Sequence, residues 1–148
     1  MRIVVKTSFI LMFLSSFMFV AFAQEKDMLM GKWLTAGGDA QVQVYQNSGK
    51  FSGRIIWLKN PNDEKGKPQL DGKNPEQALK KRPLIGTEIL QGFNYMEDGV
   101  WEGGTIYDPK TGKIYSCKIS LMSRDKINVR GFVGISLLGR TETWSRVR

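Results

Sequence analysis

Short runs of alternating apolar and polar residues fill most of the chain after Trp33, and turn residues separate these runs. In residues 40–44, Val42 and Val44 alternate with glutamines, and a turn sequence at residues 47–50 follows. A period of two is typical of strands with one buried face. Because such runs recur about every 8 to 12 residues, the pattern predicts an antiparallel barrel or sandwich with an all-β core.

We expect roughly eight strands. The first begins near Trp33, and the others lie at residues 40–44, 51–57, 88–95, 100–107, 113–121, 126–133 and 139–147. Within the strand at 51–57, the alternation places Trp57 on the same side as Ile55. Within the strand at 100–107, Gly103 and Gly104 predict a bulge or a sharp bend. An antiparallel barrel needs such bends where its strands turn corners.

One polar segment, residues 60–83, interrupts the strands and contains a candidate short helix at residues 74–81. Asn74 suits the N-cap, and Pro75 suits the first helical position. Basic side chains suit the C-terminal end, where Lys80, Lys81 and Arg82 stand, and Pro83 stops the helix. The sequence therefore predicts one short helix inside a long polar insert.

The first 23 residues have the layout of a secretory signal peptide. Arg2 and Lys6 precede an uncharged apolar run, and residues 21–23 form an A-x-A cleavage pattern. An uncleaved membrane anchor is the alternative, but the run is short for a span of about 20 residues. We expect a mature domain at residues 24–148, exported to the periplasm or secreted, with no transmembrane segment of its own.

Cleavage would lower the formal net charge from +8 to +6. A positive exported protein is attracted to anionic lipid head groups or acidic polysaccharide. The basic residues are scattered, so nucleic acid is not an expected partner. Alternatively, the positive net charge serves only to keep the surface well solvated, and the protein has no specific anionic partner.

Several classes of catalytic site lack their residues. The chain has no His, which is the commonest general base and a common metal ligand. Cys117 is the only cysteine, and the alternation puts it on the apolar face of its strand. No spacing singles out a carboxylate pair among Glu88, Glu97, Asp98, Glu102 and Glu142. We therefore expect no catalytic residue, no metal and no cofactor.

The stretch YDPKTGKIY, residues 107–115, resembles a phosphate-binding loop at first sight. A phosphate loop requires a glycine five positions before Gly112 and a hydroxyl after Lys113, whereas Tyr107 and Ile114 stand there. Asp108, Pro109 and Gly112 are instead typical of a hairpin turn. The stretch predicts a turn between two strands.

Trp33 lies at the first strand, and the last strand carries Arg140 and Arg146. In a closed barrel the first and last strands meet. A guanidinium from the last strand is then expected over the indole of Trp33, where it closes the base of the barrel by a cation–π contact.

The G-x-W sequence of residues 31–33, with an arginine on the last strand, is similar to the lipocalin and fatty-acid-binding (calycin) barrels. A longer ordered set resembles the bacterial exported domain of unknown function numbered 2147. This set comprises GRIIWL at 53–58, NP at 74–75, KKRPLIG at 80–86, WEGGTIYDP at 101–109, GKIY at 112–115, RGFVG at 130–134 and LGRTETWSR at 138–146. Lys81 stands where arginine is more usual. The resemblance implies a lipocalin-like barrel behind a signal peptide and implies no activity.

A barrel of eight strands holds one small ligand or is filled by its own side chains. Our first hypothesis is a non-enzymatic envelope protein that binds a small apolar or amphipathic ligand. The aromatic residues that would line its cavity are Trp57, Phe93, Tyr95, Trp101, Tyr107 and Tyr115. The insert would cover one barrel end, and Lys80, Lys81 and Arg82 would meet an acidic head group.

In the second hypothesis the aromatic residues fill the core, and the basic outer surface binds anionic lipid or polysaccharide. A third, an enzyme with an unusual carboxylate or tyrosine site, has no nucleophile–base pair to support it.

Overall fold

The computed structural model describes residues 25–148. The predicted signal peptide, residues 1–23, lies outside the described residues. Across residues 25–148, no helix has the length and apolar character that a membrane span requires.

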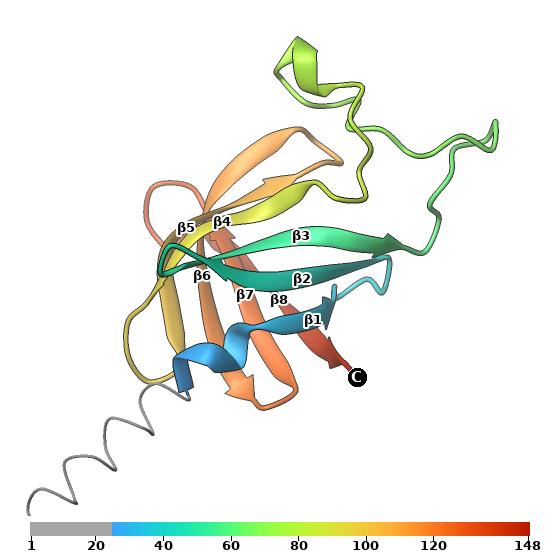
Figure 1. Ribbon diagram of the computed structural model, residues 1–148. Coiled ribbons are helices and arrows are strands. Elements are labelled where there is room, and N and C mark those ends of the chain that lie inside the picture. The colour runs from blue at the N-terminus through green and yellow to red at the C-terminus, as the bar shows by residue number, and fades with distance from the viewer. Residues whose placement is uncertain (1–24) are drawn as a thin grey trace, which may run out of the picture.

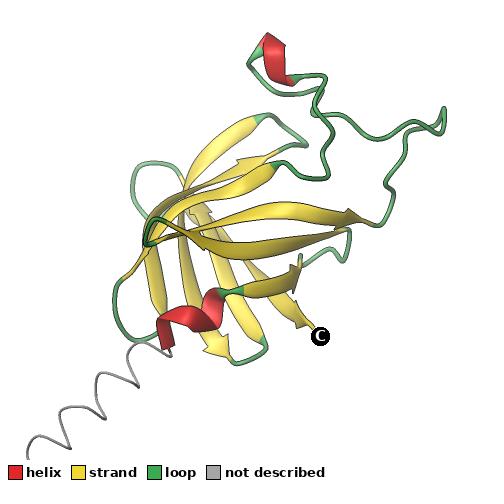
Figure 2. Cartoon of the chain, viewed as in Figure 1, coloured by secondary structure: helices red, strands yellow, loops and turns green. Residues whose placement is uncertain are grey.

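Eight antiparallel strands form a closed barrel in which each strand pairs with its neighbours in the chain and β8 pairs with β1 (Figure 1). The strands are β1 Gly31–Leu34, β2 Ala40–Asn47, β3 Lys50–Leu58, β4 Glu88–Tyr95, β5 Val100–Asp108, β6 Lys113–Ser123, β7 Lys126–Phe132 and β8 Gly139–Val147. Two 3-10 helices of one turn each complete the fold (Figure 2). The predicted all-β antiparallel barrel of about eight strands, with one short helix in the insert, is confirmed. A second short helix precedes β1.

The inward faces of the strands fill the barrel with their own side chains. Three tryptophans, Trp33, Trp101 and Trp144, are fully or almost fully buried, together with Phe51 and Phe93. Smaller apolar side chains occupy the space between them: Val42, Val44, Ile55, Leu90, Ile119, Ile127 and Val129. Burial of these large side chains is the main stabilising contribution to the fold.

The predicted bulge in β5 is present, because the pairing with β6 shifts between Trp101 and Gly104. Gly103 adopts a φ of 78°, and a Cβ on Gly104 would lie 2.5 Å from the Phe93 ring. The two glycines therefore permit a close approach between the wall of the barrel and its aromatic core.

The helix η1, Asp27–Leu29, closes one end of the barrel. Leu29 is fully buried, and its carbonyl accepts a hydrogen bond of 2.9 Å from the Trp33 indole. The Arg146 guanidinium lies 4.2 Å from the Trp33 ring centroid and donates to the carbonyls of Met28 and Met30. We call this end the closed end.

A bulge in β3 reverses the side that we expected for Trp57. Trp57 pairs with Gln41, whereas Ile55 pairs with Val42, so Ile56 is an extra residue. A one-residue shift moves the following side chain to the other face of a strand. Leu58 consequently packs against the core, and Trp57 is 40% exposed.

The insert contains a shorter helix than the sequence predicts. Its helix η2 spans only Gln77–Leu79, with Glu76 before it. The Asn74 side chain does not cap this helix. Its oxygen accepts from the Glu76 N–H at 2.8 Å, and its amide donates to Asp71 at 2.9 Å. The buried Asn74 is thus part of a turn around Asp71. Glu76 is extended, with φ −85° and ψ 116°, so the helix begins only at Gln77.

Asp71 fixes the insert to the barrel. Its fully buried carboxylate accepts a hydrogen bond of 2.6 Å from the Tyr107 hydroxyl at the end of β5. The Arg82 guanidinium forms an ion pair with the same carboxylate at 2.9 Å. Because one buried charge receives donors from Tyr107, Asn74 and Arg82, its desolvation is compensated.

Candidate functional site

The structure does not gather the predicted ligand-lining aromatic residues around one cavity. Phe93 and Trp101 are buried in the core, and Tyr95 packs beside Trp101 with 5.3 Å between the ring centroids. Tyr107 bonds to Asp71 in the insert. Of the other two, Trp57 is exposed, and Tyr115 is half-buried opposite Ile106.

The three basic residues of the insert, Lys80, Lys81 and Arg82, do not act together in the structure. Arg82 is engaged by the buried carboxylate of Asp71. Lys80 and Lys81 follow η2, which Figure 1 places well away from the barrel strands. The triplet therefore does not cover the barrel end. Arg146 is the guanidinium over Trp33, whereas Arg140 lies near the start of β8, toward the opposite end of that strand.

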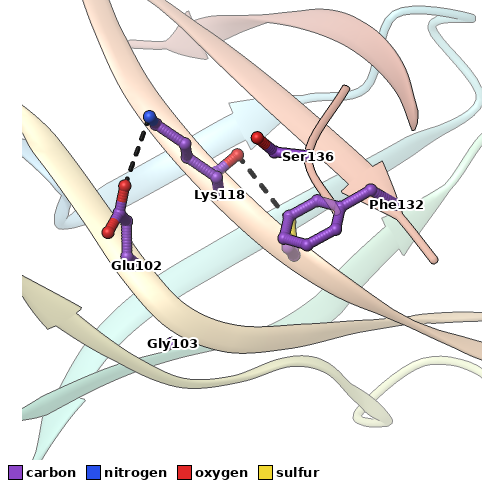
Figure 3. Close-up of a pocket in the computed structure, with 6 residues that line it drawn as sticks. Glu102, Gly103, Lys118, Phe132 and Ser136 are labelled. Atoms are coloured by element: carbon purple, nitrogen blue, oxygen red, sulfur yellow. Dashed lines mark hydrogen bonds and ion pairs between the residues drawn. The ribbon is translucent and has the colours of Figure 1, made fainter. Parts of the chain in front are cut away.

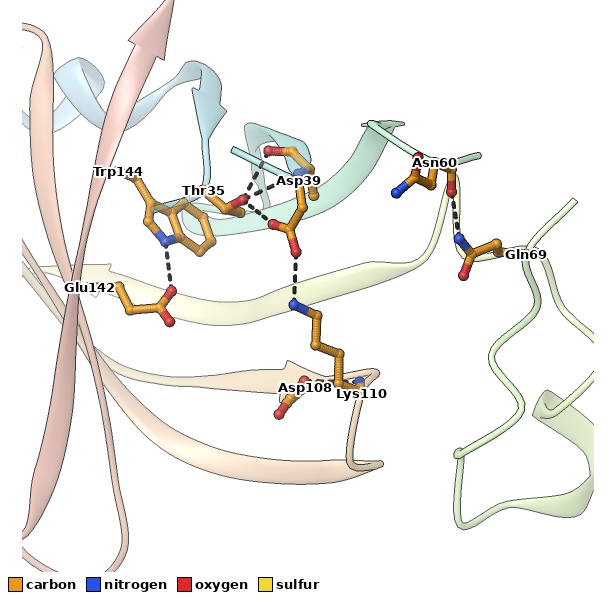
Figure 4. A network of polar contacts seen from close by, with 9 residues as sticks. Thr35, Asp39, Asn60, Gln69, Asp108, Lys110, Glu142 and Trp144 are labelled. Atoms are coloured by element: carbon orange, nitrogen blue, oxygen red, sulfur yellow. Dashed lines mark hydrogen bonds and ion pairs between the residues drawn. The ribbon is translucent and has the colours of Figure 1, made fainter. Parts of the chain in front are cut away.

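The barrel end opposite the closed end, which we call the mouth, carries an ion pair between two turns (Figure 4). The Lys110 ammonium lies 2.7 Å from Asp39, which also accepts from the Thr35 hydroxyl at 2.8 Å. The bond from Lys110 lowers the pKa of Asp39, and Asp39 raises the pKa of Lys110. Glu142 accepts from the Trp144 indole at 3.3 Å in the same region. Polar contacts thus line the mouth above the filled core.

The stretch at residues 107–115 forms the predicted hairpin turn. The Asp108 side chain accepts from the backbone N–H of Lys110 at 2.9 Å, and its carbonyl accepts from Gly112 at 2.8 Å. Gly112 has a φ of 73°, and a Cβ there would collide with the Lys73 carbonyl. The turn therefore also provides a contact with the insert.

Two adjoining pockets lie on the outer side of the barrel and share Lys118 and Ser136. Their volumes are about 270 Å³ and 340 Å³. We call them together the outer groove. Its lining residues are Glu102, Gly103, Cys117, Lys118, Ser120, Asn128, Arg130, Phe132, Ser136, Leu137 and Thr141.

Strand alternation explains why this groove is polar. Lys118 stands between Cys117 and Ile119, and both of those neighbours are buried in the core. Asn128 stands in the same way between two buried residues of β7. The alternation in the sequence predicts that these side chains of β6 and β7 point outward. It does not predict a groove, because any solvent-exposed strand face has the same polar pattern. What makes the groove is the loop between β7 and β8, which supplies Ser136 and Leu137.

Arg130 is the main charged group of the outer groove. Its guanidinium donates to the carbonyls of Ser136 and Leu137 and to the Thr141 hydroxyl, at 2.6, 3.3 and 2.8 Å. Within residues 25–148, no carboxylate forms an ion pair with Arg130. Lys118, in contrast, pairs with Glu102 at 3.2 Å (Figure 3). The groove thus presents one fixed positive charge beside hydroxyl groups and the apolar Phe132 and Leu137.

Cys117 lines the groove without supplying a reactive group. It is 2% exposed, and burial raises the pKa of its thiol to about 12. A thiol with that pKa stays protonated at neutral pH and is a poor nucleophile. No group of three or more Cys, Asp or Glu side chains in the described part of the chain is placed to hold a metal ion.

Comparison with known proteins agrees with the barrel. A solved structure titled "Protein HP1028 from the human pathogen Helicobacter pylori belongs to the lipocalin family" superimposes with a TM-score of 0.72. The match has 21% identity and covers 81% of this chain and 83% of the other. At that identity the likeness concerns the fold. No curated protein matches this chain.

The family model described as "Uncharacterized protein conserved in bacteria (DUF2147)" matches residues 31–146. This range begins at the first residue of β1 and ends at Arg146, which stacks on Trp33. It therefore includes residues of all eight strands, and the chain belongs to the DUF2147 family of uncharacterized bacterial proteins.

Proposed function

We propose that this protein is a non-enzymatic binding protein for a small amphipathic anion, which it holds in the outer groove. The Arg130 guanidinium carries the proposal, because it is fixed by three hydrogen bonds yet has no carboxylate partner among the described residues. Such a group is preorganised for a carboxylate, sulfonate or phosphate. Phe132 and Leu137 offer apolar contacts to the rest of the ligand.

Because the interior of the barrel is filled, a binding site on its outer side is favoured over a site inside it. Lipocalin barrels hold a ligand inside. Here Trp33, Trp101 and Trp144 occupy the interior, so an internal ligand would have to displace packed aromatic side chains.

We place this function in the bacterial envelope because of the signal-peptide pattern in residues 1–23. The intact mass of the protein recovered from the periplasm or medium tests this. A chain that begins at Gln24 supports export, whereas a chain that begins at Met1 and stays in the cytoplasm contradicts it.

A pair of fluorescent probes tests the binding proposal. The anion 1-anilinonaphthalene-8-sulfonate and the neutral N-phenyl-1-naphthylamine share the same rings and differ in the sulfonate. We expect saturable binding of one sulfonate probe per chain and much weaker binding of the neutral probe. The variant Ser120→Trp places an indole in the groove and should weaken binding of the anion at least about tenfold, since it removes the space that the rings need.

Gln91→Trp is the matched control, because it adds the same ring at an exposed position of β4 away from the groove. It should leave the affinity unchanged. If the two tryptophan variants bind the anion as well as the wild type does, the outer groove is not the site. If the neutral probe binds as tightly as the anion, Arg130 does not select the ligand.

A further inference from the structure

The loop between β7 and β8 exposes an unusual concentration of apolar side chains. Val133, Ile135, Leu137 and Leu138 are 68%, 58%, 83% and 71% exposed. They occupy four of six consecutive positions, residues 133–138, which we call the apolar loop. In Figure 1 this loop is the arch that joins β7 to β8. Exposed apolar clusters of this kind mark contact sites.

Hydrogen bonds hold the apolar loop in this exposed conformation. Arg130 donates to two of its carbonyls, those of Ser136 and Leu137. Within the loop, the Leu138 N–H donates to the Ile135 carbonyl at 3.0 Å, and the Ile135 N–H donates to the Val133 carbonyl at 3.1 Å. The loop is thus fixed through its backbone, and these bonds leave its side chains directed to solvent.

Two arginines stand at the base of the apolar loop. Arg130 lies on β7 just before the loop, and Glu142, two residues beyond Arg140 on β8, accepts from the Trp144 indole. Arg140 follows the loop by two residues and is exposed. Within residues 25–148, neither Arg130 nor Arg140 takes part in an ion pair. An apolar tip with uncompensated positive charge at its base is complementary to a membrane surface with anionic head groups.

We infer that the apolar loop inserts into the interface of an anionic lipid bilayer, with Arg130 and Arg140 at the level of the head groups. A protein partner suits the loop less well, since a stable interface buries about 800 Å² on each partner and a six-residue tip is small for that. A second copy of this chain would bring the two Arg140 side chains toward each other around the loop contact. The inference does not depend on the proposed small-molecule site.

Vesicle sedimentation tests the inference. The protein is expressed from its full sequence and purified in the form that its host processes, so any retained N-terminal segment is common to all variants. We expect binding to phosphatidylcholine vesicles that contain one quarter phosphatidylglycerol. Binding to pure phosphatidylcholine should be weaker, and 0.5 M NaCl should weaken binding to the anionic vesicles.

The double variant Ile135→Ser/Leu138→Ser should bind the anionic vesicles at least about tenfold more weakly, because it removes two inserting side chains. Met96→Ser/Met122→Ser is the matched control, since these exposed apolar residues lie near the opposite barrel end. It should bind like the wild type. Arg140→Ala should weaken binding, whereas Lys50→Ala on the β2–β3 hairpin should not.

The inference is overturned if the wild-type protein binds neither kind of vesicle. It is also overturned if the serine double variant binds the anionic vesicles as tightly as the wild type does. Dimerisation through the loop without vesicle binding also overturns it. Far-UV circular dichroism and the unfolding midpoint verify that each variant is folded. Ile135 and Leu138 do not line the outer groove, so their variant should keep its affinity for the sulfonate probe. Failure of the membrane inference is therefore distinguishable from failure of the proposed function.

Discussion

At the scale of single residues, Cys117 reports directly on the depth of the outer groove. Its thiol lines the groove but is 2% exposed, and its pKa is raised to about 12 by burial. We expect the native protein to react with Ellman's reagent far more slowly than the same protein in urea, roughly a hundredfold or more, because the thiolate is the reactive form.

The absorbance of the released thiolate at neutral pH measures both rates. Prompt modification of the native protein would mean that the reagent reaches the sulfur through the groove, which would contradict the burial of Cys117.

Arg146 is the second residue whose effect can be predicted. Its guanidinium makes a cation–π contact with Trp33 and two hydrogen bonds to the carbonyls of Met28 and Met30. Arg146→Lys keeps the charge but loses the planar fork, so we expect the free energy of unfolding to fall by about 2 kcal/mol.

Arg140→Lys is the control for this change, because Arg140 is exposed on the same strand. Urea unfolding should show an effect of at most about 0.5 kcal/mol for that variant. Equal effects at the two positions would contradict a closing role for Arg146.

The sequence predicted that an arginine of the last strand would stack on Trp33, but it could not choose between Arg140 and Arg146. That choice depends on the register between β1 and β8, in which Trp33 lies opposite Arg146. Register arises from pairing between distant segments and leaves no local signal in either strand.

At the scale of elements, the insert is held by a buried polar contact with β5. Burial and the bond to Asp71 raise the pKa of Tyr107 to about 12, from an ordinary value near 10. The folded state therefore keeps the hydroxyl proton at a pH where the unfolded chain loses it. The resulting stability is fully present below about pH 10 and is lost as the pH rises toward about 12.

We expect the free energy of unfolding of the wild type to decline across this interval, by at most about 1.4 kcal/mol per pH unit from Tyr107. Tyr107→Phe should remove this part of the decline. It should also lower stability at pH 7 by about 1 kcal/mol, since Asp71 loses a donor. Urea titrations of both proteins from pH 8 to pH 12 measure the difference, and parallel curves would contradict the role of Tyr107.

The strands were predictable from the sequence because period-two alternation reports directly which side chains are buried. The side of β3 on which Trp57 lies was not predictable from the sequence. The extra residue Ile56 shifts the alternation by one position, and an apolar residue at that position gives no sign of the shift. The helix in the insert was predicted too long. Asn74 is a residue type that favours the N-cap position, but its side chain instead bonds to Asp71 and to the backbone of a local turn.

At the scale of the whole molecule, the barrel has an interior filled by its own side chains and a groove on its outer surface. The aromatic residues that alternation places inside were expected to surround a ligand, and Phe93 and Trp101 pack against the core instead. The outer groove was not predictable, because it forms only where the loop after β7 lies against β6 and β7. A polar outward face and an apolar turn are each ordinary in a sequence, and only the fold brings them together.

The most direct test of the binding account is an NMR titration of the ¹⁵N-labelled protein with 1-anilinonaphthalene-8-sulfonate. We predict saturable shifts of backbone amides around the outer groove, above all at Lys118, Ser120, Arg130 and Leu137. Amides around Trp33 and Trp101 in the core should stay in place. Saturable shifts confined to the core, or to the mouth around Lys110 and Glu142, would contradict the account, since they would place the ligand inside the barrel or at its mouth.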